Sequence, residues 1–353
     1  MPAPLTWPSL LESLIAGDDL AISEATWAME RVMAGETTPA QLAALLVALR
    51  IKGETVDEIV GFRDAALDAS LPLDVDPMAL DIVGTGGDPY GIFNISSVAS
   101  IVASAAGVPV VKHGNRAASS TSGASDVLSA LGVDISIAPD RVAEVLRETG
   151  ITFAFAGLFH PGFRHAGPTR AELGISTLFN SLGPLCNPAR PEASAVGVAS
   201  LDRVPLIVGV FQTRGATALV YRGDDGIDKL TTTGHSHIWE VSRGLVTEHD
   251  LDPRDLGIPK ARIEDLVGTT PEANAEAIRA VLAGSRGPLR DIVLLNAAAG
   301  LSAFELAQDP DRRDVPIVER LGRNAAIAAS AIDSGAAAAK LEQWAAATRA
   351  TRD

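Results

Sequence analysis

The stretch DIVGTGGDPYGIFNISS, residues 81–97, has residue types suited to holding an anion. A short apolar run is followed by three closely spaced glycines, Gly84, Gly86 and Gly87. Glycine permits positive φ values and lets the backbone approach a ligand closely. A helix is expected to begin at Asn94 or Ser96, and its first free N–H groups favour a phosphate. The loop is neither a dinucleotide fingerprint nor a Walker motif, and a tight turn before a capped helix without a ligand also fits it.

A second polar cluster follows the apolar run VPVV and contains Lys112, His113, Gly114, Asn115 and Arg116. Its side chains predict a local positive site in an otherwise acidic chain. Small residues follow, with hydroxyl groups that add hydrogen-bond donors, before a helix expected to begin near residue 125. A solvated basic turn would explain the charges but not the small residues. We assign no general base to His113, because a lone histidine is more often a hydrogen-bonded structural residue.

A third cluster, FHPGFRHAGPTRAELG, combines basic side chains with prolines and glycines. Arg170 is expected near the start of a helix, where its guanidinium can pair with a planar carboxylate through two hydrogen bonds. A surface salt bridge with a nearby glutamate is the alternative. His160 and His165 lack the cysteine or carboxylate companions of a zinc site, so we reject a metal site there. The following segment FNSLGPLCNP is expected to be a stiff loop.

The elements that must position these clusters form two parts. Residues 9–70 are expected to be helical, with Thr38 and Thr55 as caps and Pro39 at a first helical position. After a proline-containing break, short apolar runs at 79–85, 108–114, 151–157, 194–200 and 216–223 alternate with helical stretches. This alternation predicts an α/β fold with a mostly parallel sheet flanked by helices, whose ligands bind at the carboxyl ends of the strands. We expect a helical domain at 1–72, an α/β domain at 73–353, packing of 165–185 on the helical domain, and a surface helix at 324–350.

Composition limits the classes of function. The 353 residues contain 44 Asp+Glu and 29 Lys+Arg, a formal charge of -15 that disfavours binding to nucleic acid or anionic membranes. The one cysteine, Cys186, excludes an internal disulfide framework and fits a reducing cytoplasm. The N-terminus lacks a basic, apolar secretion signal, and the longest near-apolar run is about 14 residues, shorter than a membrane span. A cytoplasmic location is therefore expected.

In their order along the chain, these clusters resemble the anthranilate phosphoribosyltransferases. The resemblance rests on GTGGD, NIS, KHGNRA-SS, R-ELG, FN-LGPL-NP and GDDGID…TTT, and it extends over nearly the whole chain. It implies a pentosyltransferase of tryptophan biosynthesis that transfers the 5-phosphoribosyl group from phosphoribosyl pyrophosphate to the amine of anthranilate and releases pyrophosphate. It also implies one or two Mg²⁺ ions and a homodimer joined through the helical domain.

The same resemblance implies the roles of individual residues. The phosphoribosyl pyrophosphate site would comprise Gly84, Gly87, Asp88, Ile92, Asn94, Ile95, Ser96, Ser97, Lys112, His113, Gly114, Asn115, Arg116, Ala117, Ala118, Ser119, Ser120 and Ala124. The anthranilate site would comprise Gly84, Asn115, Arg170, His113 and Phe163. Magnesium would be held by Ser96 and Asp228.

Two departures from the family pattern bear on the function. Lys229 stands where the family has a metal-binding glutamate, and an ammonium cannot ligate Mg²⁺. Either Lys229 offsets substrate charge directly and one metal site is weak or absent, with Asp224 and Asp225 as possible substitute ligands, or Lys229 points to solvent. Ile92 stands where a threonine is usual, which removes one phosphate contact.

These departures leave other functions open. One is a phosphoribosyltransferase that uses a different aromatic acid as acceptor, and another is a catalytically impaired paralogue. A nucleoside phosphorylase of the same fold is disfavoured because a Lys-His-Ser lead-in to the glycine loop is absent. A nucleic-acid-binding relative is disfavoured by the charge of -15.

Overall fold

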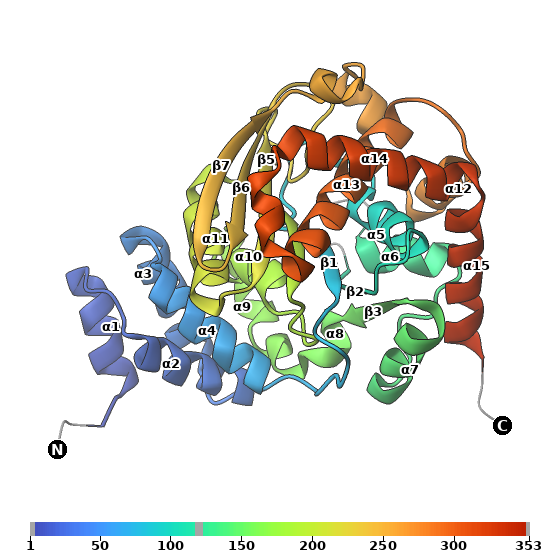
Figure 1. The fold of residues 1–353 in the computed structure, drawn as a ribbon. Coiled ribbons are helices and arrows are strands. Elements are labelled where there is room, and N and C mark those ends of the chain that lie inside the picture. The colour runs from blue at the N-terminus through green and yellow to red at the C-terminus, as the bar shows by residue number, and fades with distance from the viewer. Residues whose placement is uncertain (1–3, 117–122, 351–353) are drawn as a thin grey trace.

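The computed structural model describes residues 4–116 and 123–350, which form a helical part and a larger α/β part (Figure 1). The helical part begins the chain and contains α1 (Trp7–Ala16), α2 (Ile22–Ala34), α3 (Pro39–Lys52) and α4 (Val56–Asp68). The hydroxyls of Thr38 and Thr55 accept hydrogen bonds from backbone N–H groups of the first turns, and Pro39 opens α3 as expected. The predicted helix starts at 38 and 55 are therefore confirmed.

The α/β part is built on one seven-stranded sheet in the order β3-β2-β1-β4-β5-β6-β7. Strands β1 to β5 are parallel to their neighbours, whereas β6 and β7 pair antiparallel at one edge. The mostly parallel α/β fold predicted from the sequence is confirmed. The strands are β1 (Leu80–Gly84), β2 (Val110–Gly114), β3 (Ile151–Phe155), β4 (Ala193–Gly197), β5 (Thr217–Gly223), β6 (Ser236–Ser242) and β7 (Leu245–Leu251).

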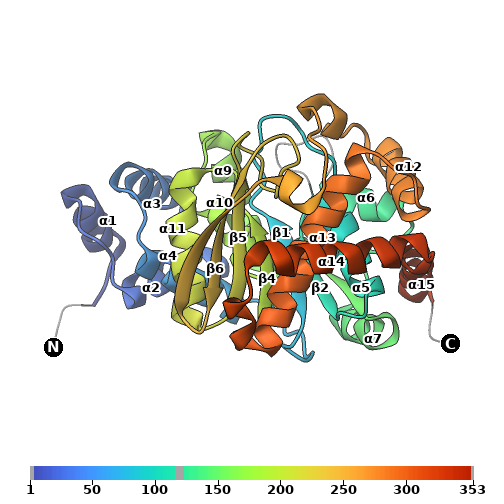
Figure 2. The ribbon, with the colours of Figure 1, turned by 45° about the horizontal axis from the view of Figure 1, so that its top comes forward.

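Helices cover both faces of this sheet and fill the connections between its strands (Figure 2). The α-helices of this part are α5 (Ile95–Ala105), α6 (Ala124–Ala130), α7 (Pro139–Thr149), α8 (Ala156–Phe159), α9 (Gly167–Leu173), α10 (Phe179–Leu182), α11 (Val204–Arg214), α12 (Pro271–Leu282), α13 (Pro288–Gln308), α14 (Ile317–Asp333) and α15 (Ala336–Arg349). Single 3₁₀ turns are η1 (Pro161–His165), η2 (Gly183–Leu185), η3 (Leu201–Arg203), η4 (Pro253–Leu256), η5 (Ile263–Leu266) and η6 (Pro310–Asp314). Within the described residues, no helix is long and apolar enough to cross a membrane.

Two large apolar clusters lie on opposite faces of the sheet, because successive side chains of a strand point to opposite faces. In β1, Ile82 belongs to the cluster formed with α5, α13 and α14, whereas Val83 belongs to the other cluster. That second cluster also contains α11 and the interior of the helical part, including Leu46 and Phe62. Figures 1 and 2 both place α1 to α4 beyond α11, at one side of the sheet. A continuous core therefore joins the helical part to one face of the sheet.

Three local expectations are corrected by the structure. Residues 179–185 form the short helical turns α10 and η2, not a stiff loop, because Phe179, Leu182 and Leu185 are buried and anchor each turn. The tail at 324–350 is not one surface helix. It belongs to α14 and α15, which bury Ile332 and Trp344 because their alanines permit close packing. The antiparallel strands β6 and β7 were not predicted.

Candidate functional site

The candidate site lies where the strand order of the sheet reverses. Strand β1 has β2 on one side and β4 on the other, and the loops after β1 and β4 leave the sheet in opposite directions. Ligands of open α/β sheets bind at this switch point, outside the carboxyl ends of the strands. Gly84 and Gly197 are the last paired residues of β1 and β4. The predicted glycine loop therefore begins at the position where a ligand is expected.

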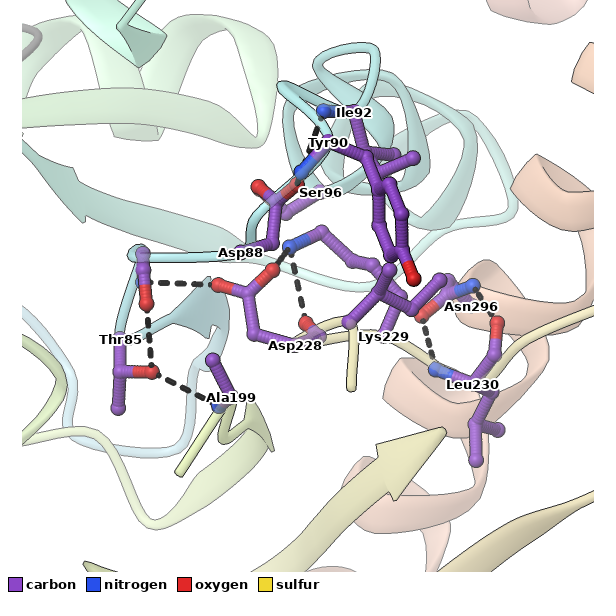
Figure 3. Close-up of polar contacts among 12 residues, drawn as sticks. Thr85, Asp88, Tyr90, Ile92, Ser96, Ala199, Asp228, Lys229, Leu230 and Asn296 are labelled. Carbon is purple, nitrogen blue, oxygen red and sulfur yellow. Dashed lines mark hydrogen bonds and ion pairs between the residues drawn. The ribbon is translucent and has the colours of Figure 1, made fainter. Parts of the chain in front are cut away.

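The glycine loop after β1 is anchored by hydrogen bonds to neighbouring loops (Figure 3). The N–H of Thr85 donates to the carbonyl of Gly197 at 2.9 Å, and the Thr85 hydroxyl accepts from the N–H of Ala199 at 3.1 Å. The N–H of Gly86 donates to Asp228 Oδ2 at 2.8 Å. The loop is thus tied to β4 and to the 227–230 segment.

Gly84 and Gly197 are required by the close approach of the 227–230 segment. A Cβ atom at Gly197 would lie 1.7 Å from the carbonyl oxygen of Asp228. A Cβ at Gly84 would lie 2.1 Å from Asp228 Oδ2 and 3.0 Å from Lys229 Nζ. Any side chain at either position would push this segment away from the strand ends.

The start of α5 faces the same loop. Asn94 occupies the N-cap position, but its side chain makes no cap hydrogen bond, since its Oδ1 accepts from Asn274 Nδ2 at 2.9 Å. Two N–H groups of the first turn are satisfied by the backbone, since Ile95 donates to the carbonyl of Phe93 and Ser97 to the carbonyl of Asn94. Asp88 Oδ1 accepts from the N–H groups of Tyr90 and Ile92, which shapes the loop that leads into the helix (Figure 3). Ile92 also pairs with Val267 in an isolated bridge.

Lys112 provides a buried cation below this helix start. Its Nζ donates to the carbonyl of Ile82 at 2.7 Å and lies 3.5 Å from the Ser96 hydroxyl. Burial lowers the pKa of Lys112 to about 8, and the nearby Lys229 adds to this effect while Asp81 opposes it. Burial also raises the pKa of Asp81 to about 6, against the opposing effect of Lys112. Two opposite charges are thus placed inside the sheet under the site.

His113 points to the other face of β2 from Lys112, as alternation along a strand requires. Its Nδ1 lies 2.9 Å from the carbonyl of Gly183, while its buried Nε2 has no partner among the described residues. Burial lowers the pKa of His113 to about 3, and the neighbouring His160 contributes. The ring is therefore neutral, so Lys112 but not His113 contributes charge to the local positive site that the sequence predicts.

An aromatic chain connects His113 to Arg170. The His113 and His160 rings meet edge to face at 5.4 Å, and His160 stacks on Phe163 at 4.9 Å. Phe163 contacts Phe179 at 5.8 Å, and the Arg170 guanidinium lies 4.9 Å over the Phe179 ring. Three of the residues predicted for anthranilate, His113, Phe163 and Arg170, are therefore linked through His160 and Phe179.

Arg170 lies in the middle of the short helix α9, not at its start as expected. Burial lowers its pKa, although the guanidinium remains a cation at neutral pH. Within residues 4–116 and 123–350, Arg170 forms no ion pair, so the alternative of a surface salt bridge with a glutamate has no support there. A half-buried guanidinium that stacks on an aromatic ring suits a carboxylate ligand.

The other predicted site residues differ in exposure, and some lie outside the described part of the chain. Asn115 and Arg116 are exposed at the end of β2, and Ala124 opens α6 beside Gly114. Gly87 has a φ of 81° and space for a ligand around it. The side chains of Ile95 and Ser97 are buried, and their backbone N–H groups donate to the carbonyls of Phe93 and Asn94, so neither residue offers a free backbone donor to a ligand. Four predicted residues lie outside the described part of the chain: Ala117, Ala118, Ser119 and Ser120.

The predicted metal ligands fit a divalent cation unequally. The half-buried hydroxyl of Ser96, with one long contact to Lys112, is a suitable oxygen donor. Asp228 fits poorly, because Lys229 Nζ donates to its Oδ1 at 2.5 Å and Gly86 occupies its Oδ2 (Figure 3). The side chain of Lys229 is only 10% exposed, so the alternative in which it points to solvent is wrong.

The two possible substitute ligands are directed elsewhere. Asp225 Oδ2 accepts hydrogen bonds from the hydroxyls of Thr231 and Thr233, both at 2.6 Å. Asp224 lies 3.7 Å from His237 Nε2 on the surface. Across the described ranges, no group of three or more His, Cys, Asp or Glu residues could hold a metal ion. The idea that Asp224 or Asp225 replaces the missing glutamate therefore has no geometric support.

Sequence reasoning missed several residues that shape the site. Asp81 accepts from the backbone N–H of His113 and from Asn187 Nδ2, and so joins β1, β2 and the 186–190 segment. A charged residue inside an apolar strand was the available signal. Asn296 exchanges hydrogen bonds with the backbone of Leu230 and holds the segment that carries Lys229 (Figure 3). Nothing local in the sequence marks Asn296.

Comparisons with known proteins agree with this geometry. Residues 8–70 match the family model described as "Glycosyl transferase family, helical bundle domain", and residues 76–338 match "Glycosyl transferase family, a/b domain". The chain is 75% identical over 351 residues to the anthranilate phosphoribosyltransferase of Clavibacter michiganensis, which covers 99% of this chain and 100% of the relative.

Solved structures give the same result. The anthranilate phosphoribosyltransferase of Thermus thermophilus is 42% identical with a TM-score of 0.88, covering 97% of this chain and 99% of that one. The enzyme from Saccharomyces cerevisiae in complex with PRPP and Mg is 26% identical with a TM-score of 0.86, covering 97% of each chain. The resemblance seen in the sequence motifs is thereby confirmed, and the chain belongs to the anthranilate phosphoribosyltransferase family of glycosyl transferases.

Proposed function

We propose that this enzyme transfers the 5-phosphoribosyl group from phosphoribosyl pyrophosphate to the amine of anthranilate, a step of tryptophan biosynthesis. The observation that carries this proposal is the 75% identity over 351 residues to an anthranilate phosphoribosyltransferase. The geometry supports it, because anion-binding features meet at the switch point of the sheet while Arg170 and its aromatic neighbours form a separate carboxylate-binding group.

The proposed pyrophosphate side comprises the glycine loop at 84–88, the start of α5 and Lys112. The leaving group departs as the amine forms a bond to the anomeric carbon, so the site must position two partners and stabilise a departing anion. The ammonium of Lys112, which lies beneath the end of β1 and the start of α5, would supply positive charge for this purpose. When bound beside Ser96, Mg²⁺ would neutralise charge on the pyrophosphate.

The proposed acceptor side comprises Arg170, Phe163 and His113. The Arg170 guanidinium would hold the anthranilate carboxylate, and the aromatic chain from Phe179 to His113 provides an apolar wall for the ring. The amine of anthranilate is a nucleophile in its neutral form, so no general base is required. His113, which is neutral, orients groups here without carrying charge.

Assembly and location are part of the proposal. We propose a homodimer joined through the helical part at residues 1–72, where Ile15 and Ile51 are 72% and 82% exposed on α1 and α3. Apolar side chains exposed on neighbouring helices suit burial against a second copy. The cytoplasm is the proposed compartment, since the one cysteine of the chain, the buried Cys186, cannot form an internal disulfide.

The test is loss of anthranilate fluorescence on incubation with phosphoribosyl pyrophosphate and Mg²⁺. We expect a time-dependent loss, matched by pyrophosphate release and absent when phosphoribosyl pyrophosphate is omitted. If fluorescence persists, substituted benzoates are offered and pyrophosphate is measured. Pyrophosphate release with one of these benzoates would identify that compound as the acceptor in place of anthranilate. No pyrophosphate release with any of them would identify an impaired paralogue.

A further inference from the structure

The Asp228–Lys229 pair lies directly under the glycine loop and leaves neither carboxylate oxygen of Asp228 without a partner. Lys229 Nζ donates to Asp228 Oδ1 at 2.5 Å and to the Asp228 carbonyl at 2.8 Å. The N–H of Gly86 donates to Asp228 Oδ2 at 2.8 Å. The two side chains are only 10% and 4% exposed, so this ion pair belongs to the floor of the site (Figure 3).

The position of this pair makes the Lys229 ammonium a neighbour of the bound anion. A Cβ built at Gly84, the last residue of β1, would come within 3.0 Å of Lys229 Nζ. An ammonium has three N–H donors, and among the described residues two of them have acceptors, both on Asp228. The third is available to an oxygen of a ligand held by the loop.

We propose that Lys229 is a built-in cation that takes the place of a divalent ion at Asp228, so that phosphoribosyl pyrophosphate binds with one metal ion and not two. This inference rests on the proposed function. A divalent ion at Asp228 would have to displace the ammonium and bring two cations to one carboxylate. Asp224 and Asp225 provide no second carboxylate there, because they contact His237 and two threonine hydroxyls.

In this proposal, Ser96 holds the single metal ion. Ser96 lies in the first turn of α5, and among the described residues its hydroxyl contacts Lys112 Nζ at 3.5 Å. A hydroxyl oxygen with phosphate oxygens and water is a ligand set that Mg²⁺ accepts. The pyrophosphate would thus have a fixed ammonium at the Asp228 side and a metal ion at the Ser96 side.

The test counts metal ions without turnover. Mn²⁺ binding is measured by electron paramagnetic resonance at saturating phosphoribosyl pyrophosphate, with no acceptor present. We expect one Mn²⁺ per wild-type chain and an additional one in Lys229→Glu. The exposed Lys260→Glu, which changes net charge equally, should keep one. Two Mn²⁺ per wild-type chain would overturn the proposal, as would a folded Lys229→Glu variant that gains none.

A second variant keeps the test decisive if Lys229→Glu does not fold. In EDTA, calorimetry should show phosphoribosyl pyrophosphate binding to wild type about tenfold or more tightly than to Lys229→Gln, the loss expected for one charged hydrogen bond. Equal affinities would refute the role of Lys229. Failure of wild type to bind phosphoribosyl pyrophosphate under any metal condition would refute the proposed function together with this inference, whereas binding with two metal ions would refute the inference alone.

Discussion

Lys112 and His113 are adjacent in one strand, yet their environments are opposite. Lys112 points toward β1 and α5 and stays near the anion side of the site, whereas His113 points toward η2 and the aromatic chain. In the proposed function, one strand would thus supply a cation to one substrate region and a neutral ring to the other. The division follows from the period of two along a strand.

The buried neutral His113 predicts a pH dependence of stability. Its pKa of about 3 in the folded state lies below the unfolded value, so the unfolded chain binds more protons between pH 6.5 and 3. The contribution of the neutral His113 ring to the free energy of unfolding is therefore fully present above pH 6.5 and is lost as the pH falls toward 3. In urea unfolding, the free energy of unfolding of wild type minus that of His113→Asn should be about 2 kcal/mol larger at pH 6.5 than at pH 4.5.

The comparison with His113→Asn isolates this contribution. Asp81, whose pKa is raised to about 6 by burial, acts in the opposite direction between pH 4 and 6, but it is present in both proteins and cancels. Parallel pH profiles for the two proteins would show that the His113 ring is not held neutral by burial.

Arg170 predicts a selective effect on acceptor binding. Arg170→Met removes the guanidinium proposed to hold the carboxylate, so KM for anthranilate should rise about tenfold or more, while KM for phosphoribosyl pyrophosphate stays unchanged. The exposed neighbour Arg164→Met is the matched control and should change neither value. Steady-state kinetics that show equal effects on both substrates would assign Arg170 a general structural role.

At the scale of elements, the ends of β1 and β4 control how closely the 227–230 segment approaches. Gly197→Ala places a Cβ 1.7 Å from a backbone carbonyl, so this segment must move. We expect a loss of about 3 kcal/mol or more in the free energy of unfolding and weaker binding of phosphoribosyl pyrophosphate. Gly167→Ala, which meets open space, is the control. Equal unfolding free energies and equal affinities for phosphoribosyl pyrophosphate in the two variants would contradict a close approach of the 227–230 segment to Gly197.

The sequence predicted the elements with strong local signals. Five parallel strands were visible because each is a short apolar run that ends in a small or polar residue, and β1 is a clear example. Strand β7, with the sequence LVTEHDL, was missed because its exposed position at the sheet edge permits charged residues throughout. The turns of α10 were missed because proline and glycine suggested a loop, whereas buried Phe179 and Leu182 decide the conformation.

The site was predicted as residues but not as contacts. The glycine loop, Lys112 and Arg170 were found because their types and order are distinctive. The burial of these residues and the neutral state of His113 were not predicted. Both depend on residues far along the chain, such as Gly183 and His160. The approach of the Asp228–Lys229 pair to Gly84 likewise depends on residues that are far apart along the chain.

At the scale of the whole molecule, the proposed dimer predicts a measurable change in mass. Ile15→Glu or Ile51→Glu would place a charge on the face proposed to meet a second copy, so light scattering should show the mass falling from two chains to one. Leu245→Glu, at a position 57% exposed on the edge strand β7, should leave the mass unchanged. A wild-type protein that is a monomer at micromolar concentration would refute the proposed dimer.

The continuous core between the helical part and the sheet has a consequence for synthesis. Residues of α1 to α4 share one buried cluster with α11, β5 and Val241 of β6, so their apolar surface is covered only after about 170 more residues are made. At typical synthesis rates this delay is roughly 10–30 s. A nascent chain arrested after residue 72 should therefore bind a hydrophobic dye and be cleaved readily by protease, whereas one arrested after the full chain has emerged should resist both.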